Sequence, residues 1–156
     1  MAKRFWRFIS TAYDILCLIW VWGIFVIIPD HSGVSFWTKI ILIGATFISI
    51  SDSIDAARGK NSLFKVVMKL MYCFLFLLGV FSFLYFAYGT TANFNVPLTH
   101  FDAFYFALGT LMTGTGNING VSDVARYLQA AQMGLDLILI GFAASLAVSR
   151  FTATRS

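Results

Sequence analysis

The sequence predicts an all-α membrane protein with four transmembrane helices and a short re-entrant helix between the third and the fourth. Three observations support this fold class. The chain of 156 residues is 59% hydrophobic and 12% charged, which is about half the charged share of a soluble domain. Four apolar runs are long enough to span a bilayer. A further apolar run, beginning at Phe101, is too short to span and ends in glycines. Soluble fold classes are therefore excluded.

Residues 1–65 are expected to form an N-terminal segment that crosses the membrane twice. The first apolar run ends at Pro29 and reaches spanning length when it is extended back to Phe5. A secretory signal peptide shares the basic start, but bulky residues precede Pro29 where small residues are needed for cleavage. The second span is predicted at 34–51, and the polar loop 52–65 follows it.

Residues 66–150 form the second predicted unit. The third span, 66–88, is apolar apart from Lys69 and ends in aromatic residues of the kind found at membrane interfaces. The short apolar run follows after a polar loop, and the last span covers 124–148. Residues 151–156 are left as a short tail.

The distribution of Lys and Arg predicts the orientation of the chain. Four spans place the N-terminus, the loop 52–65 and the C-terminus on one side of the membrane. That side collects nine of the eleven basic residues, namely Lys3, Arg4, Arg7, Arg58, Lys60, Lys65, Lys69, Arg150 and Arg155. The positive-inside rule then predicts that both termini are cytoplasmic, in the plasma membrane. The basic clusters are expected to contact anionic membrane lipids.

Other polar residues give no sign of an enzyme. The histidines, His31 and His100, lie in predicted loops, and neither metal-ligand spacing nor a grouping of nucleophile and base is present. No cofactor, no bound metal and no nucleic-acid partner are expected. Asp14 lies inside the first apolar run, where it either sits near the lipid headgroups or pairs with a basic residue such as Lys69.

The short apolar run carries the chemistry that is expected of the chain. Thr99 and Asp102 have the spacing of a capping box, which predicts a helix starting at about His100. If this helix dips inward from outside, its C-terminal end near Met112 is partly negative and favours a cation. In the glycine-rich strand 113–117, carbonyl oxygens can turn toward an axis and replace the water around an ion. Such backbone at membrane depth must be buried or line water.

The stretch Thr110-Leu111-Met112-Thr113-Gly114-Thr115-Gly116-Asn117-Ile118, set between two spans, resembles the pore unit of tetrameric potassium channels, whose signature reads roughly TLTTVGYGDI. The likeness covers about residues 66–150, and the first two spans resemble small bacterial members of that family. The resemblance implies a homotetrameric pore that conducts potassium passively. It also implies a selectivity filter and a pore cavity, the filter formed by Thr113, Gly114, Thr115, Gly116 and Asn117 and the cavity near Met112 and Asp136.

The filter departs from the family pattern in three places. Matching Thr113 to the filter threonine leaves one residue missing before Gly114, whereas matching the glycines without a gap puts Met112 in the threonine's place. Thr115 replaces the usual aromatic residue, and Asn117 replaces the aspartate at the outer mouth. A weakly selective or sodium-conducting channel therefore stays open as an alternative, as does a non-conducting scaffold or partner subunit.

Three residues of the last span, Gly134, Asp136 and Gly141, are candidates for roles beyond packing. An unpaired charge at the position of Asp136 costs about 2.5–3.5 kcal/mol, so the carboxylate is expected to face protein or water. One interpretation places four copies around the cavity, and the other has the carboxylate protonated or bonded to a neighbouring helix, through Ser82 or Tyr72. Gly134 and Gly141 are candidate gating hinges or, alternatively, sites of close helix packing.

Overall fold

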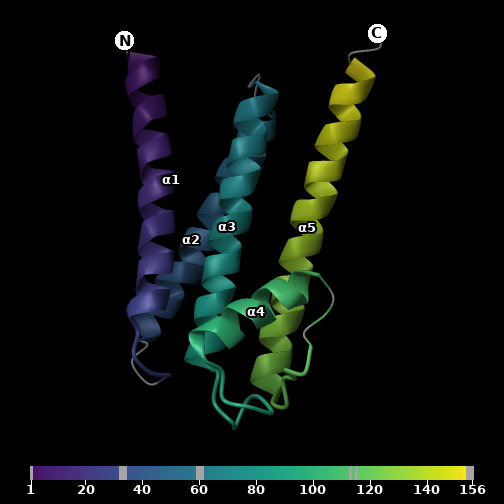
Figure 1. Ribbon diagram of the computed structural model, residues 1–156. Coiled ribbons are helices and arrows are strands. Elements are labelled where there is room, and N and C mark those ends of the chain that lie inside the picture. Colours follow the sequence, from purple (N-terminus) through teal and green to yellow (C-terminus); the bar gives the residue numbers. More distant parts are fainter. Residues whose placement is uncertain (1, 32–34, 59–61, 113, 115, 154–156) are drawn as a thin grey trace.

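The computed structural model describes residues 2–31, 35–58, 62–112, 114 and 116–153. Within these ranges it contains five α-helices and no strand longer than an isolated bridge. The helices are α1 (Ala2–Ile27), α2 (Phe36–Arg58), α3 (Leu63–Ala87), α4 (His100–Leu111) and α5 (Asp123–Ala153) (Figure 1). The all-α part of the predicted fold class is therefore confirmed.

Three of the described helices are long and apolar enough to cross a membrane. The qualifying segments are Phe36–Ala56 in α2, Leu63–Ala87 in α3 and Asp123–Leu146 in α5. The apolar part of α1, Ala12–Ile27, is shorter. That α1 also crosses the membrane, which would bring the number of spans to four, therefore stays a prediction. The helix α2 also continues to Arg58, through residues that were expected to form a loop.

The helix α3 is the centre of the bundle. It packs against each of the other four helices, and most of its apolar length is buried. The opposite holds for α5, which packs against α3 and α4 but leaves most of its own surface exposed. Figure 1 shows α3 between α1 and α5. The helix α4 lies obliquely in the half of the bundle that is farther from the two chain ends.

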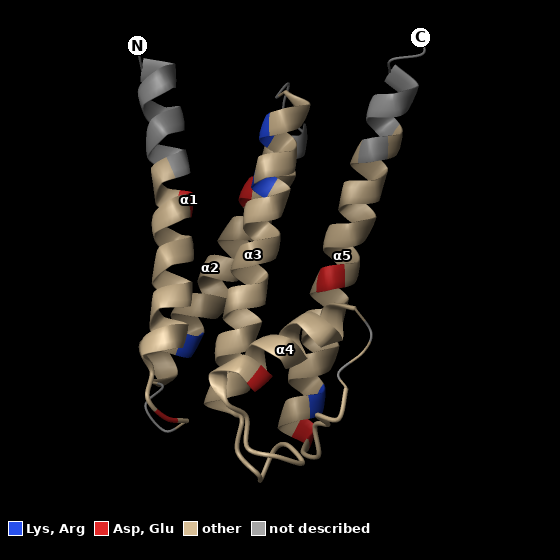
Figure 2. Cartoon of the chain, in the orientation of Figure 1, with Lys and Arg blue, Asp and Glu red and all other residues tan. Residues whose placement is uncertain are grey.

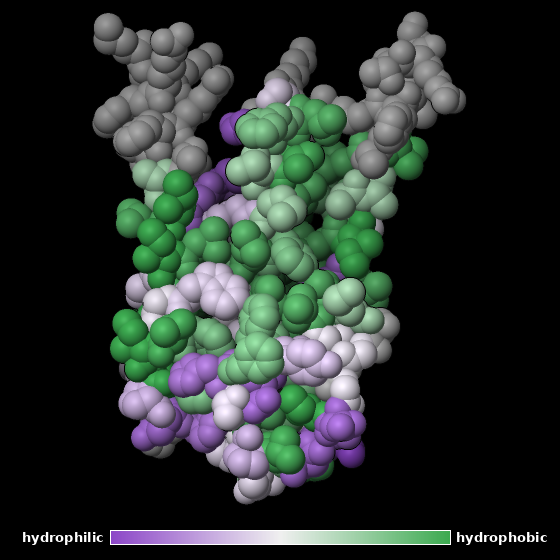
Figure 3. All heavy atoms as spheres, viewed as in Figure 1, coloured by the Kyte–Doolittle hydropathy of each residue, from purple (hydrophilic) through white to green (hydrophobic). Residues whose placement is uncertain are grey.

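Both chain ends lie at one end of the bundle, and the loops that follow α1 and α3 lie at the other (Figure 1). On the face shown in Figure 3, apolar residues cover the middle of the helices and hydrophilic residues gather at the loop end. This distribution is consistent with a membrane protein.

Three charged residues join α1, α2 and α3. The ammonium group of Lys69 is hydrogen bonded to Asp14 and lies 3.8 Å from Asp52 Oδ2. Figure 2 shows acidic positions on α1 and basic positions on α3 in the half of the bundle that holds the chain ends. The side chains of Lys69 and Asp14 are only 11% and 12% exposed. Of the two interpretations of Asp14, the structure thus shows the pair with Lys69. Burial explains this outcome, because a carboxylate removed from solvent needs a compensating charge.

An aromatic cluster fixes α4 against α3. The rings of Tyr85, Phe94 and Phe106 are all buried, and each pair meets edge to face, with centroids 4.8–6.2 Å apart. Such pairs add about 0.5–1.5 kcal/mol to the gain from burial. The three residues come from α3, the following loop and α4. The cluster therefore fixes the position of α4 along the axis of α3.

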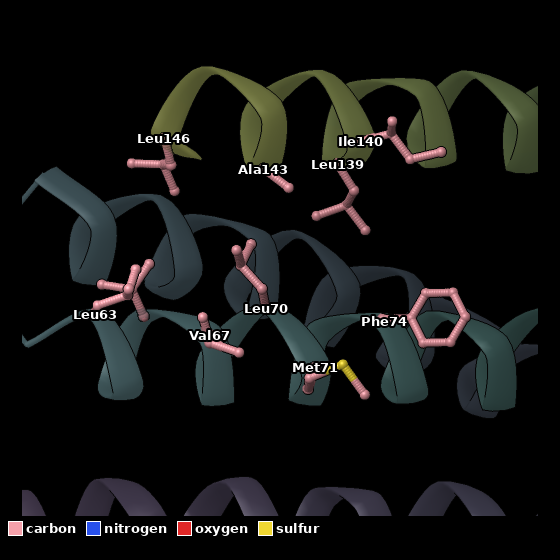
Figure 4. A pocket seen from close by; sticks show the side chains of 10 residues that line it. Leu63, Val67, Leu70, Met71, Phe74, Leu139, Ile140, Ala143 and Leu146 are labelled. Carbon is pink, nitrogen blue, oxygen red and sulfur yellow. The ribbon is translucent and has the colours of Figure 1, made fainter. Parts of the chain in front are cut away.

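The end of α3 near Leu63 is separated from α5 by an apolar crevice of about 390 Å³. Side chains of the two helices face one another across it (Figure 4). They include Val67, Leu70 and Phe74 of α3 and Leu139 and Leu146 of α5. The contact between α3 and α5 is therefore incomplete at this end.

Candidate functional site

The start of α4 is held by the predicted capping box. Thr99 Oγ1 accepts a hydrogen bond from the Asp102 amide at 3.1 Å, and Asp102 Oδ2 accepts one from the Thr99 amide at 3.0 Å. The helix begins at His100, as the sequence predicted. Asp102 also places a negative charge in the first turn, where the helix dipole favours it.

His100 anchors this end of α4 to α1 and α3. Its Nε2 lies 2.9 Å from the Ile28 carbonyl oxygen, which can only accept, so the ring nitrogen donates. The ring stacks on Phe86 with centroids 3.9 Å apart and meets Phe25 edge to face. His100 was expected in a loop or at a helix start, and the structure shows it as a packing residue of α4.

Backbone hydrogen bonds turn the chain at the end of α4. The Met112 amide donates to the Leu108 carbonyl at 3.2 Å, and the Gly114 amide donates to the Gly109 carbonyl at 2.8 Å. Met112 is 72% exposed, and a Cβ atom added at Gly114 would meet, apart from its two chain neighbours, no atom of the described residues within 4 Å. One side of the segment at Gly114 is therefore open. Thr113 lies outside the described residues, as does Thr115.

Gly116 has φ +61°, a left-handed conformation that favours glycine. A Cβ atom at this position would lie 3.2 Å from the hydroxyl oxygen of Tyr105. Tyr105 of α4 therefore packs against the chain at Gly116, in the segment 112–119 that follows α4. The predicted filter residues did not include it, although an aromatic residue on the helix that precedes a glycine strand is a signal that could have indicated it.

Asparagine side chains of the loop before α4 bind residues 117–122, in the later part of the segment that follows α4. Asn95 Nδ2 donates to the Asn117 carbonyl at 2.7 Å, and Asn95 Oδ1 accepts from the Asn119 amide at 2.9 Å. Asn93 Oδ1 accepts a hydrogen bond from the Ser122 hydroxyl at 2.7 Å. A bridge between Phe94 and Gly120 lies between these contacts. The predicted site residues did not include these asparagines.

Asp136 is buried within its own chain. It is 7% exposed, and Oδ2 has no hydrogen-bond partner among the described groups. The Ser82 hydroxyl donates to the Leu78 carbonyl instead. Gln132, one turn earlier on α5, donates from Nε2 to the Ala107 carbonyl of α4 at 2.7 Å. Gln132 thus faces α4 in the same chain, whereas Met112, which was expected to line a cavity with Asp136, is exposed.

The two candidate hinge glycines lie inside an uninterrupted helix. Gly134 and Gly141 are both part of α5, and a Cβ atom at either would meet no other atom within 4 Å. Close packing within one chain does not require glycine at these positions. Their proposed role as hinges stays a prediction.

Comparison with known proteins adds no family to this description. No protein-family model matches the chain, and no match was found among the curated proteins or the solved structures. The functional interpretation therefore depends on the motif and on the geometry of α4 and the segment that follows it.

Proposed function

We propose that this chain is one subunit of a homotetrameric channel that conducts cations passively, with potassium as the preferred ion. The observation that carries the proposal is the pairing of α4 with the segment 112–119. The helix α4 is capped and anchored at the loop end of the bundle, and the segment returns from its far end to the same loop end (Figure 1).

The electrostatics of this pair suit a cation. The last carbonyl groups of a helix carry a partial negative charge, and here they lie beside the turn at Met112 and Gly114. The side of the chain at Gly114 is open, so its backbone can approach an axis. One chain supplies a single segment of this kind, whereas a coordinating ring of carbonyls needs several copies. Four subunits around one axis meet this requirement.

The membrane arrangement belongs to the same proposal. If α1 crosses the membrane in addition to α2, α3 and α5, both termini are cytoplasmic and α4 enters the plasma membrane from outside, in agreement with the positive-inside rule. The exposed apolar surface of α5 is then covered by neighbouring subunits and lipid. Potassium is chosen by resemblance alone. Because Thr115 and Asn117 depart from the family signature, sodium conduction is the second candidate.

Flux through liposomes tests the proposal directly. Purified protein should carry potassium down a gradient, and the reversal potential with potassium on one side and sodium on the other gives the preference. An absence of flux for every monovalent cation would overturn the channel function. A preference for sodium would leave the channel and reverse the ion assignment.

Gly114→Ala is the sharpest variant for this test. Beyond its two chain neighbours, the added Cβ meets no atom of the described residues, so folding should be retained while the open side of the segment is blocked. Conduction should fall at least tenfold, with tetramer assembly unchanged. Gly44→Ala in α2 is the matched control, because its Cβ also meets no atom within 4 Å. Equal currents in both variants would show that segment 112–119 is not the filter.

A further inference from the structure

Five buried side-chain polar atoms have no hydrogen-bond partner among the described groups, and four of them lie on α3, α4 and α5. These four are the hydroxyl oxygens of Tyr85 and Thr110, Oε1 of Gln132 and Oδ2 of Asp136. All four residues are more than nine-tenths buried, at 0%, 2%, 2% and 7% exposed. Leaving such groups unsatisfied is costly, so each calls for a partner.

Contacts between the helices place the four residues around one end of α4. The Tyr85 ring meets Phe106 with centroids 4.8 Å apart, and Gln132 Nε2 bonds to the Ala107 carbonyl at 2.7 Å. Thr110 follows these two α4 residues by about one turn, and therefore lies on the same face.

The same register holds on the other two helices. Asp136 follows Gln132 by one turn of α5, so the two side chains share a face. The Thr110 hydroxyl lies close enough to the Tyr85 phenol to act on it as a hydrogen-bonding group, although the two do not meet the geometry of a direct bond. The Asp136 carboxylate lies within electrostatic reach of that phenol. In the same way, the Gln132 amide lies close enough to act on the Asp136 carboxylate, although Asp136 Oδ2 accepts no direct hydrogen bond from the described groups. The four polar groups thus converge from α3, α4 and α5.

We propose that these groups bind one buried water molecule. The hydroxyls of Tyr85 and Thr110 supply two donors, and the oxygens of Gln132 and Asp136 supply two acceptors. A water molecule accepts twice and donates twice, which matches this set, and buried waters typically make about three such bonds. The water links α3 and α5 to the end of α4 from which segment 112–119 departs.

This site gives Asp136 a different role from a cavity residue. The carboxylate positions the C-terminal end of α4 through the water, and it does not contact a permeating ion. The inference depends on contacts within one chain and not on conduction. Its test is therefore a stability measurement. This measurement can overturn the water site while the protein still conducts cations, and it can support the water site in a protein that does not conduct.

A double-mutant cycle on the full chain in detergent tests the site. Tyr85→Phe removes one donor and keeps the ring, so it should lower the thermal unfolding midpoint of the otherwise native protein by about 3 °C. In an Asp136→Leu background the water has lost its strongest acceptor, and Tyr85→Phe should then produce no drop. An equal drop in both backgrounds would overturn the proposal.

Two further variants make the cycle secure. Thr110→Val keeps the shape of the side chain and serves as a second background, in which the effect of Tyr85→Phe should also shrink. This background decides the question if Asp136→Leu does not fold. Ser82→Ala is the control, because the Ser82 hydroxyl bonds within α3 at 2.7 Å and its loss should cost the same in every background.

The occupant itself is identified by two measurements. A high-resolution map should show one water within hydrogen-bond distance of the four atoms. Direct bonds from the hydroxyls to Asp136 in that map would overturn the water site. The oxygen set also admits a sodium ion, so unfolding is compared in sodium and choline chloride. A midpoint that rises with sodium in the native protein and not in Asp136→Leu would replace the water by a cation.

Discussion

The side-chain amide of Asn95 donates a hydrogen bond to the carbonyl oxygen of Asn117, 2.7 Å away and 22 positions later in the chain. The same side chain accepts a bond from the Asn119 amide at 2.9 Å. One side chain therefore satisfies two backbone groups of the segment that is proposed to form the outer end of the filter. The loop before α4 acts as a support for that segment.

Replacing Asn95 by Leu should loosen this support. Both bonds are exposed to solvent, so together they contribute about 1 kcal/mol, and their loss should speed hydrogen exchange of the Asn119 amide about fivefold. The same change should reduce the discrimination between potassium and sodium, because the carbonyl of Asn117 is no longer held. Hydrogen exchange followed by mass spectrometry measures the first effect, and bi-ionic reversal potentials measure the second.

Asn119→Ala provides the matched control. It removes an amide side chain from the same region but keeps the backbone groups of residue 119 that Asn95 contacts. Exchange at position 119 should then stay near the native rate. If Asn95→Leu and Asn119→Ala behave alike, the side chain of Asn95 does not hold the segment.

At Gly79, α3 closely approaches α1. A Cβ atom added there would lie 2.8 Å from Val21 Cγ1 and 3.1 Å from Trp22 Nε1. The Val21 methyl belongs to a stiff side chain that cannot turn away easily. Gly79→Ala should therefore lower the free energy of unfolding by about 1–3 kcal/mol, measured by denaturant unfolding in detergent.

A second glycine separates crowding from helix propensity. A Cβ atom at Gly44 in α2 meets nothing within 4 Å, so Gly44→Ala should leave stability unchanged or raise it by up to about 1 kcal/mol. A stabilising effect of Gly79→Ala comparable with that of Gly44→Ala would mean that α1 and α3 do not pack as closely as described.

Local patterns in the sequence predicted the parts of the structure that depend on neighbouring residues. Thr99 and Asp102 are three positions apart, and their capping box and the start of α4 were predicted correctly. Long apolar runs predicted the helices because such runs need no partner to be recognised. The polarity of the residues after Ser51 predicts a loop there, and this prediction is wrong, because these residues continue the helix α2 to Arg58.

Contacts between residues that are far apart in the sequence could not be predicted from local patterns. Helical spacing alone places Gln132 and Asp136 on one face, but periodicity does not say which helix that face meets. The structure shows that Gln132 faces α4. Likewise, nothing local connects Asn95 with Asn117, or decides between the two environments that were considered for Asp14. In each case the partner is brought close only by the packing of the bundle around α3.

The pair formed by Asp14 and Lys69 should be strongly coupled. Lys69→Met leaves the buried Asp14 carboxylate without its main counter-charge and should cost about 3–5 kcal/mol of unfolding free energy. The double variant Asp14→Leu/Lys69→Met removes both charges and should cost much less, because no charge remains buried. Asp52→Asn is the control: Asp52 is 53% exposed and 3.8 Å from Lys69, so its loss should cost at most about 1 kcal/mol. A double variant that is as unstable as Lys69→Met would show that packing, and not the unpaired charge, determines the loss.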